Sequence, residues 1–184
     1  MLIADGGVSL NIRNTMDAIL LCKNLNYLTG VKLDVFLSLD DIFVLANSND
    51  LKTFTLSNKK INELNYHDLK KIKFPSHIFN YYIPTLEEVL NNFSYLKILI
   101  LELHINQDIS FYLDKLTKLL NKYPYEYYFI IKDNSINNNK VLKDNEYIYL
   151  NNFDNLEELS SDIFIITKYP EKIYKKLLSF DKNS

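Results

Sequence analysis

The side chains that could act as nucleophiles or proton carriers are few and scattered. The chain has one cysteine, Cys22, in an apolar run, and three histidines, His67, His77 and His104. A single cysteine cannot form an internal disulfide or a cysteine-based zinc cluster, whereas an imidazole can carry a proton near neutral pH. With only three glycines and no G-x-G-x-x-G, Walker, G-x-S-x-G or H-E-x-x-H pattern, the sequence excludes the common nucleotide-binding and hydrolase motifs.

Composition predicts one globular domain that spans residues 1–184. The chain is 47% hydrophobic, which supports a sizeable core and rules out intrinsic disorder. Its 21 basic and 23 acidic residues give a net charge of −2, so there is no global attraction to nucleic acid or to an anionic membrane. The basic cluster at 70–73 is expected to be a solvated helix end, and no nucleic-acid partner is expected.

The start of the chain lacks the basic and apolar segments of a secretory leader, and the longest apolar runs are too short to cross a bilayer. We therefore expect no membrane span and a cytoplasmic, reducing location.

Short apolar runs alternate with longer amphipathic stretches. Strands are expected at 2–4, 31–35, 42–46, 97–103, 127–131, 147–150 and 163–167, and helices at 14–23, 61–72, 85–93, 109–123, 156–160 and 170–178. Thr85, followed by Glu87 and Glu88 in the first turn, predicts a capped helix start. This alternation predicts an α/β fold with a parallel sheet, either doubly wound or closed into a barrel.

Seven segments form an ordered set of motifs: I-A-D-G-G at 3–7, I-R-N-T at 12–15, K-L-D-V at 32–35, V-L-A-N-S-N-D-L at 44–51, I-P-T-L-E-E-V-L at 83–90, L-E-L-H at 101–104 and S-D-I-F-I-I-T-K-Y-P at 161–170. In order and spacing they resemble the glycerophosphodiester phosphodiesterase family. The family patterns are I-A-H-R-G, P-E-N-T, E-x-D-V, V-v-i-H-D-x-x-L, I-P-T-L-E-E-V-L, I-E-I-K and G-x-D-G-I-I-T-D-x-P.

The resemblance implies a TIM-like barrel of the phosphatidylinositol-phospholipase-like type, with its site at the C-terminal ends of the strands. Such enzymes hydrolyse glycerophosphodiesters to glycerol phosphate and an alcohol. They use Mg²⁺ or Ca²⁺ held by carboxylates, two histidines for proton transfer and a cationic side chain for the phosphate.

Matched onto this chain, most of that machinery is replaced. The family positions for proton transfer and phosphate contact hold Asp5, Asn47 and His104. Asp34 and Glu102 match two metal ligands, whereas Lys32 stands where a third carboxylate is expected. An ammonium group repels a divalent cation by several kcal/mol in a poorly solvated pocket. We therefore expect metal binding to be lost, no cofactor, and a pseudoenzyme that serves as a binding or assembly module.

The remaining charges allow three interpretations. Lys32 could be a structural ion-pair partner of Asp34 and Glu102. A residual anion site for a phosphorylated small molecule could instead be formed by Lys32, His104, Lys168 and Arg13. The alternative function is an active phosphodiester hydrolase that uses a rearranged site, with His104 and Asp5 in place of the usual proton carriers.

The chain is short for this fold, because a TIM barrel has typically about 250 residues. Between the fifth expected strand and the next one there is only a polar gap, at 132–146. We therefore expect one βα unit, the sixth, to be missing together with the helix after strand five. The result would be a barrel of about seven strands that is incompletely closed, and its two edges would need covering. Tyr125, Tyr127 and Tyr128 near the gap either pack in the core or mediate homodimerisation.

Overall fold

The computed structural model describes residues 1–8, 12–72, 74, 82–92, 97–105, 109–131, 142, 147–149 and 164–181. Seven strands form one sheet. They are β1 (Leu2–Asp5), β2 (Gly30–Leu37), β3 (Phe43–Leu45), β4 (Ile98–Leu103), β5 (Glu126–Ile130), β6 (Tyr147–Tyr149) and β7 (Phe164–Thr167). Each lies at a position where the apolar runs predict a strand.

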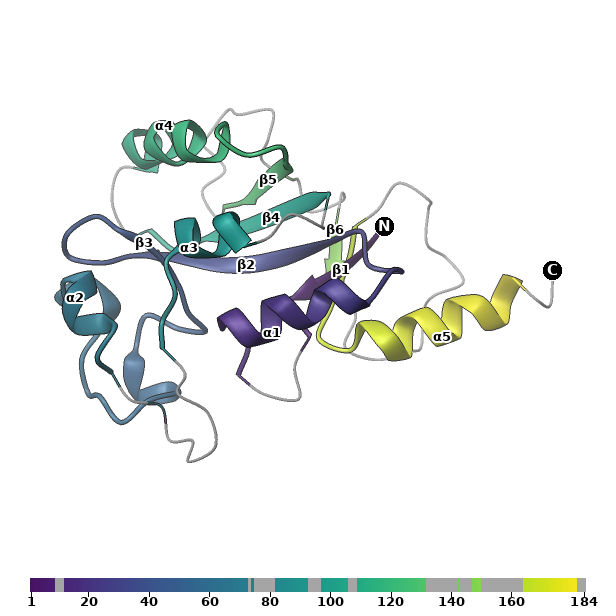
Figure 1. The fold of residues 1–184 in the computed structure, drawn as a ribbon, viewed down its shortest axis with the longest axis horizontal. Coiled ribbons are helices and arrows are strands. Elements are labelled where there is room, and N and C mark those ends of the chain that lie inside the picture. The colour runs from purple at the N-terminus through teal and green to yellow at the C-terminus, as the bar shows by residue number, and fades with distance from the viewer. Residues whose placement is uncertain are drawn as a thin grey trace.

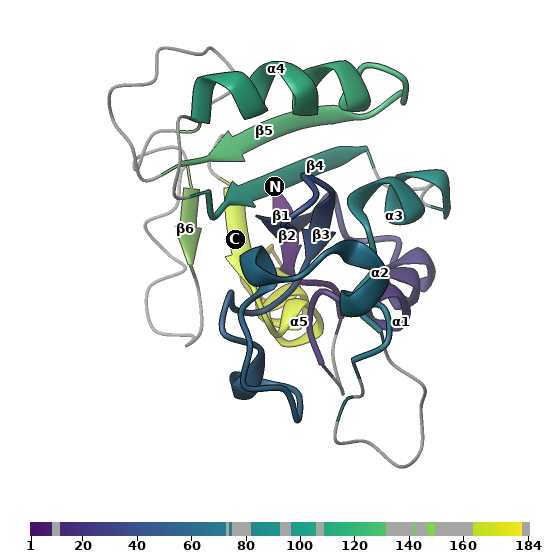
Figure 2. The ribbon, with the colours of Figure 1, turned by 90° about the vertical axis from the view of Figure 1, so that its left-hand side faces the viewer.

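Six of these strands are parallel and follow the order β5-β4-β2-β1-β7-β6. The end strands β5 and β6 are not paired with each other in the described part of the chain, so the sheet is an open half-barrel (Figures 1 and 2). This confirms the predicted α/β fold and the incompletely closed, shortened barrel of the TIM-like type. The predicted loss of a βα unit concerns residues that lie largely outside the described ranges.

The third strand differs from the expectation of an all-parallel sheet. β3 runs antiparallel to β2, with Val35 opposite Leu45 and Leu37 opposite Phe43. The physical reason is the short connection from β2 to β3, because a parallel crossover needs about a dozen residues or more. Asp41 closes this turn with a left-handed φ of 57°, and the Ser38 N–H donates to the carbonyl of Ile42 at 3.0 Å.

The helices are α1 (Met16–Leu20), α2 (Tyr66–Leu69), α3 (Leu86–Asn92), α4 (Ile109–Leu120) and α5 (Pro170–Asp181), with 3-10 turns η1 (Leu21–Asn24), η2 (Leu51–Thr53) and η3 (Ile61–Glu63). The predicted cap is confirmed: the Glu88 N–H donates to Thr85 Oγ1, and the Thr85 N–H donates to Glu88 Oε2, each at 2.9 Å. The helix predicted at 156–160 lies outside the described residues. No described helix is long and apolar enough to cross a membrane.

Alternation along the strands gives the sheet two apolar faces. On β2, Val31, Leu33 and Val35 point outward and pack with α1, α3, α4 and α5, which flank the sheet in Figure 1. The inner face carries a second cluster, which includes Ile3 of β1 and Ile100 of β4. Because side chains alternate along a strand, the remaining positions of the inner face, at the C-terminal strand ends, are left for polar residues.

The edge strand β5 is partly covered by the chain itself. Leu142, isolated among the described residues of the gap, donates its N–H to the carbonyl of Phe129 at 2.8 Å and packs in the inner cluster. The tyrosines near the gap also pack inward: Tyr125 and Tyr127 against the outer core and Tyr128 against the inner one. These contacts agree with the core-packing interpretation of the tyrosines.

Candidate functional site

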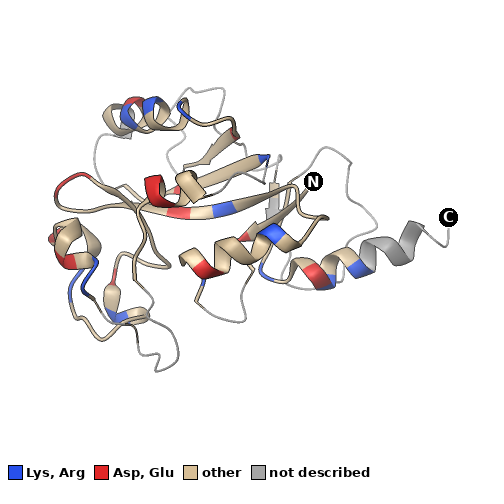
Figure 3. Ribbon diagram, in the orientation of Figure 1, with Lys and Arg blue, Asp and Glu red and all other residues tan. Residues whose placement is uncertain are grey.

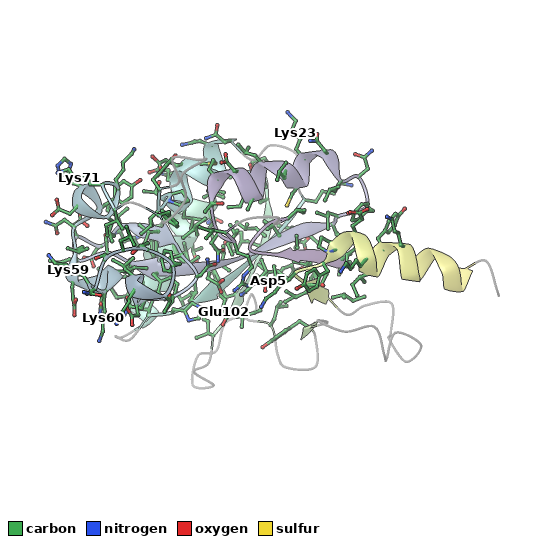
Figure 4. All side chains as sticks on the ribbon, turned by 90° about the horizontal axis from the view of Figure 1, so that it is seen from below. Asp5, Lys23, Lys59, Lys60, Lys71 and Glu102 are labelled. Atoms are coloured by element: carbon green, nitrogen blue, oxygen red, sulfur yellow. The ribbon has the colours of Figure 1, made fainter. Side chains whose placement is uncertain are left out.

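Four charged side chains gather on the inner face, where the central parallel strands end. Asp5 ends β1, Lys32 and Asp34 lie on β2, and Glu102 lies on β4. The register brings them together, because Asp5 pairs with Lys32 and Asp34 with Glu102 across adjacent strands. In Figure 4, Asp5 and Glu102 lie near the centre of the molecule, whereas the labelled lysines lie at its periphery. This set, which we call the Lys32 cluster, stands at the end of the sheet where TIM-type folds carry their sites.

The Lys32 ammonium binds all three carboxylates. Its Nζ lies 2.6 Å from Asp34 Oδ1, 2.7 Å from Glu102 Oε2 and 3.2 Å from Asp5 Oδ1. The Lys32 side chain is only 4% exposed. An ammonium group has three hydrogens to donate, so the number of its donors equals the number of carboxylates that surround it.

Arg13 extends the cluster toward solvent. Its Nη1 lies 2.6 Å from Asp5 Oδ2, so Asp5 is shared between two cations. The turn that follows β1 makes this possible: Gly6 adopts a φ of 70°, its N–H donates to the Lys32 carbonyl at 2.7 Å, and its own carbonyl accepts from the Asn14 N–H at 2.8 Å. A side chain at Gly6 would place its Cβ 2.7 Å from the Arg13 Cβ, so this close approach requires glycine.

Asn14 is a member of the site that sequence reasoning did not identify. Its side-chain amide donates to Asp34 Oδ2 at 2.7 Å, to the Ala46 carbonyl at 3.2 Å and to Asn47 Oδ1 at 3.1 Å. Its Oδ1 accepts from the Asp34 N–H at 3.1 Å, and its backbone is left-handed, with φ 58°. An asparagine directly before the N-cap Thr15 is the available signal, because asparagine tolerates this conformation better than most residues.

His104 forms the solvent-facing side of the cluster. Its Nε2 lies 3.3 Å from Asp34 Oδ1 and 3.5 Å from Glu102 Oε1, and its side chain is 30% exposed. The ring stacks on Phe36 with centroids 4.6 Å apart. His104 therefore reaches two of the carboxylates that Lys32 also binds.

These contacts set the protonation state of Asp34. Burial alone raises the pKa of a carboxyl group, but here the hydrogen bond with His104, the charge and hydrogen bond of Lys32 and the Asn14 amide outweigh it. The pKa of Asp34 is therefore held well below its usual range, and Asp34 is a carboxylate at neutral pH.

The structure brings most of the predicted site residues together. Asp5, Lys32, Asp34, Glu102, His104 and Arg13 share the ion pairs described above. Asn47 joins through Asn14. Lys168 follows β7 and is exposed, and the cluster's ion pairs in the described part of the chain do not include it.

The arrangement can be tested for a divalent cation. Among the described residues, Asp34, Glu102 and His104 form a group of the kind that can hold a metal ion. Their donor atoms lie within 4.8 Å of one another. Mg²⁺ and Ca²⁺ need carboxylate oxygens at about 2.0–2.6 Å, but Lys32 Nζ already lies 2.6 and 2.7 Å from Asp34 and Glu102 oxygens. An ion between the same two carboxylates would stand beside an ammonium group. The residues therefore do not fit a divalent cation.

The fold is that of the glycerophosphodiester phosphodiesterases, as the sequence motifs predict. The Oleispira antarctica phosphodiesterase, solved with the product sn-glycerol-3-phosphate, superposes with a TM-score of 0.65 at 23% identity over 73% of this chain. A glycerophosphodiester phosphodiesterase of Parabacteroides distasonis gives a TM-score of 0.64 at 17% identity over 98% of this chain, and one of Agrobacterium tumefaciens gives 0.58 at 13% identity over 73%. No family model and no curated protein matches the sequence.

The TM-scores show a shared fold. The chain spans 58% of the Oleispira antarctica chain and 58% of the Agrobacterium tumefaciens chain, whereas the alignment with the Parabacteroides distasonis protein covers 97% of that protein.

Proposed function

We propose that this protein is a glycerophosphodiester phosphodiesterase-like pseudoenzyme that serves as a binding or assembly module. The observation that carries the proposal is the position of the Lys32 ammonium, 2.6–3.2 Å from three carboxylates. A metal-dependent phosphodiesterase would use such carboxylates to hold the cation that neutralises the phosphoryl oxygens. Here an amino group of the protein takes up that negative charge.

Proton transfer is also compromised at this site. Asp5, at one histidine position of the family motif, is an ion-pair partner of both Arg13 and Lys32. Asn47, at the other histidine position, cannot carry a proton at neutral pH. General acid and base groups each contribute typically about a hundred- to ten-thousand-fold to a rate, so the loss of two of them supports an inactive protein.

Turnover is the direct test. The purified protein would be incubated with glycerophosphocholine and with a chromogenic phosphodiester, adding Mg²⁺, Ca²⁺ or Mn²⁺ in turn, and release of glycerol phosphate or chromophore measured. The Oleispira antarctica phosphodiesterase is the matched positive control. We expect no release above the buffer rate. Metal-dependent release that Glu102→Gln abolishes would contradict the proposal.

An active phosphodiester hydrolase with a rearranged site is the second candidate. It is favoured by the grouping of Asp34, Glu102 and His104 within 4.8 Å, since these residues could act together if the Lys32 side chain moved away. In that case activity would depend on His104, and His104→Ala would abolish release while Lys172→Ala would not. Activity that His104→Ala leaves unchanged would exclude this candidate.

The ligand we propose for the module is a phosphorylated small molecule, held at the rim by Arg13, His104 and Lys168, with the buried Lys32 ammonium behind them. The support is that Arg13 and His104 are partly exposed at the cluster, and guanidinium groups suit phosphate. Glycerol phosphate should raise the melting temperature, and Arg13→Ala and Lys168→Ala should each reduce the shift. Lys172→Ala on α5 is the control. Equal shifts in all variants would contradict this ligand site.

The assembly role we propose is a homodimer that covers an end of the open sheet, where strand edges invite pairing. Sedimentation velocity over a hundredfold range of concentration tests it. A monomer throughout would contradict the dimer.

A further inference from the structure

A concave site away from the Lys32 cluster lies between the β2–β3 turn and helices α2, α3 and α4, which are labelled in Figure 1. Its volume is about 400 Å³, within the range of small-molecule pockets. Among the described residues, its lining contains no member of the Lys32 cluster. A function of this site would therefore be separate from that of the Lys32 cluster.

Three lysines line this groove: Lys115 and Lys118 of α4, and Lys122 in the turn that follows α4. The spacing of three residues places Lys115 and Lys118 on one face of α4, and Figure 3 shows basic residues on this helix. All three side chains are exposed. A chain with a net charge of −2 thus presents a positive wall at this groove.

The two outer lysines are bound to the opposite walls. Lys115 Nζ donates to the Asp41 carbonyl at 2.8 Å, and Lys122 Nζ lies 4.0 Å from Glu87 Oε1. Lys118 lies between them in the sequence, and the described residues show no ion pair or hydrogen bond that engages it. Lys118 is therefore the lysine best placed to meet a ligand.

The rest of the lining is largely apolar. Ile42, Phe43 and Leu119 contribute carbon surface, and Ile42 remains 37% exposed. The carboxylates that line the groove are Asp41 and Glu87, so its three lysines leave an excess of one positive charge. A negatively charged group next to Lys118 would balance that excess, and an apolar body would cover the exposed part of Ile42.

We propose that this groove is a binding site for a small organic anion that has an apolar body and one acidic group. The lysine wall supplies the charge complementarity, and the apolar lining supplies the surface that such a ligand buries. The site is separate from the Lys32 cluster, so it does not depend on whether that cluster is catalytically active.

The probe is anilinonaphthalene sulfonate, an aromatic monoanion whose fluorescence rises on binding to apolar sites. Titration of the folded protein should give saturable binding with one site per chain. Lys118→Glu should weaken the affinity at least about fivefold, since it replaces an attraction by a repulsion. Ile42→Ser should weaken it through the loss of apolar contact. Lys172→Glu, with the same change of charge on α5, should leave it unchanged.

Circular dichroism and melting temperature would establish that each variant is folded, because the probe also binds partly unfolded chains. Equal affinity in Lys118→Glu and Lys172→Glu, or fluorescence that does not saturate, would overturn the proposal.

Discussion

At the inner site, three carboxylates share the positive charge of one lysine side chain. Asp5, Asp34 and Glu102 all contact the Lys32 ammonium, and the Asp34 and Glu102 side chains are only 8% and 14% exposed. A buried ion pair contributes little compared with an apolar replacement of both partners, but removal of one partner leaves an uncompensated charge. The role of Lys32 is therefore best measured by removing it alone.

Lys32→Met should lower the free energy of unfolding by about 3–5 kcal/mol at neutral pH, because three carboxylates lose their common partner. Urea denaturation followed by circular dichroism measures the change. Lys70→Met is the matched control: Lys70 pairs with Glu88 at 3.2 Å but is 52% exposed, so its loss should cost at most about 1 kcal/mol. Similar losses in the two variants would show that the cluster is not tightly coupled.

The acid stability of the protein should depend on Asp34. Its pKa in the folded state lies below the ordinary value, so the unfolded state binds its proton first as the pH falls. The contribution of Asp34 is thus fully present above its unfolded pKa of about 4 and is lost progressively below it. Urea midpoints measured from neutral pH down to the acid limit of folding should fall less steeply in Asp34→Asn. Parallel curves for the two proteins would refute this assignment.

At the scale of elements, α5 packs on the loop that follows η1 through an aromatic pair. Tyr27 stacks on Tyr174 of α5 with ring centroids 4.3 Å apart. The Tyr27 hydroxyl is buried and has no hydrogen-bond partner among the described residues, and burial raises its pKa. The ring contributes to packing, whereas the hydroxyl gave up its hydrogen bonds to water on folding and gained none in the described part of the protein.

Tyr27→Phe should therefore leave the free energy of unfolding unchanged or raise it by up to about 1 kcal/mol. Tyr66→Phe is the comparison, because the Tyr66 hydroxyl donates to Glu88 Oε2 at 2.9 Å and its removal should cost about 1 kcal/mol. Thermal denaturation of both variants distinguishes the two cases. A clear decrease in the free energy of unfolding of Tyr27→Phe would mean that the Tyr27 hydroxyl does form a hydrogen bond.

The 3-10 turn η1 holds the one cysteine against the outer core. Cys22 is 1% exposed, and burial raises the pKa of its thiol to about 11. Since the thiolate is the reactive form, the folded protein should react with a disulfide reagent at pH about 8 at least about a hundredfold more slowly than the urea-unfolded chain. Equal rates would indicate that η1 opens readily.

The order of elements could be predicted because each strand is a short apolar run and each helix has its own spacing. The direction of β3 could not, because apolar periodicity does not encode which neighbour a strand pairs with. The short turn that closes at Asp41 determined it instead.

The candidate site, too, could be predicted from the sequence only in part. Motif order located Asp5, Lys32, Asp34, Glu102 and His104, which the structure brings into contact. The role of Asn14 depends on a left-handed backbone and on contacts with the residues around Ala46, and neither can be derived from residue type. Lys168 shared a motif with the site, but motif membership does not fix where a side chain at a strand end points.

At the scale of the whole molecule, the sheet carries an apolar cluster on each face, and a third cluster around Phe36 and Val44 adjoins them. Leu116 of α4 and Ile100 of β4 are both fully buried, on the outer and inner faces respectively. Because the clusters on the two faces are built on the same strands, the protein should unfold in a single transition.

Leu116→Ala and Ile100→Ala should each lower the free energy of unfolding by about 2–5 kcal/mol while keeping one cooperative transition. Circular dichroism and tyrosine fluorescence should report the same midpoint in each variant. Two separated midpoints in either variant would show that the faces fold independently.

The ammonium in the Lys32 cluster is covalently attached to β2, and this distinguishes it from a bound ion. A bound ion is in equilibrium with the surrounding solution, so chelators, competing metals or starvation can remove it. None of these treatments can remove the amino group of a lysine, because it is part of the chain. The end of the half-barrel therefore keeps this cation whatever the supply of magnesium or calcium.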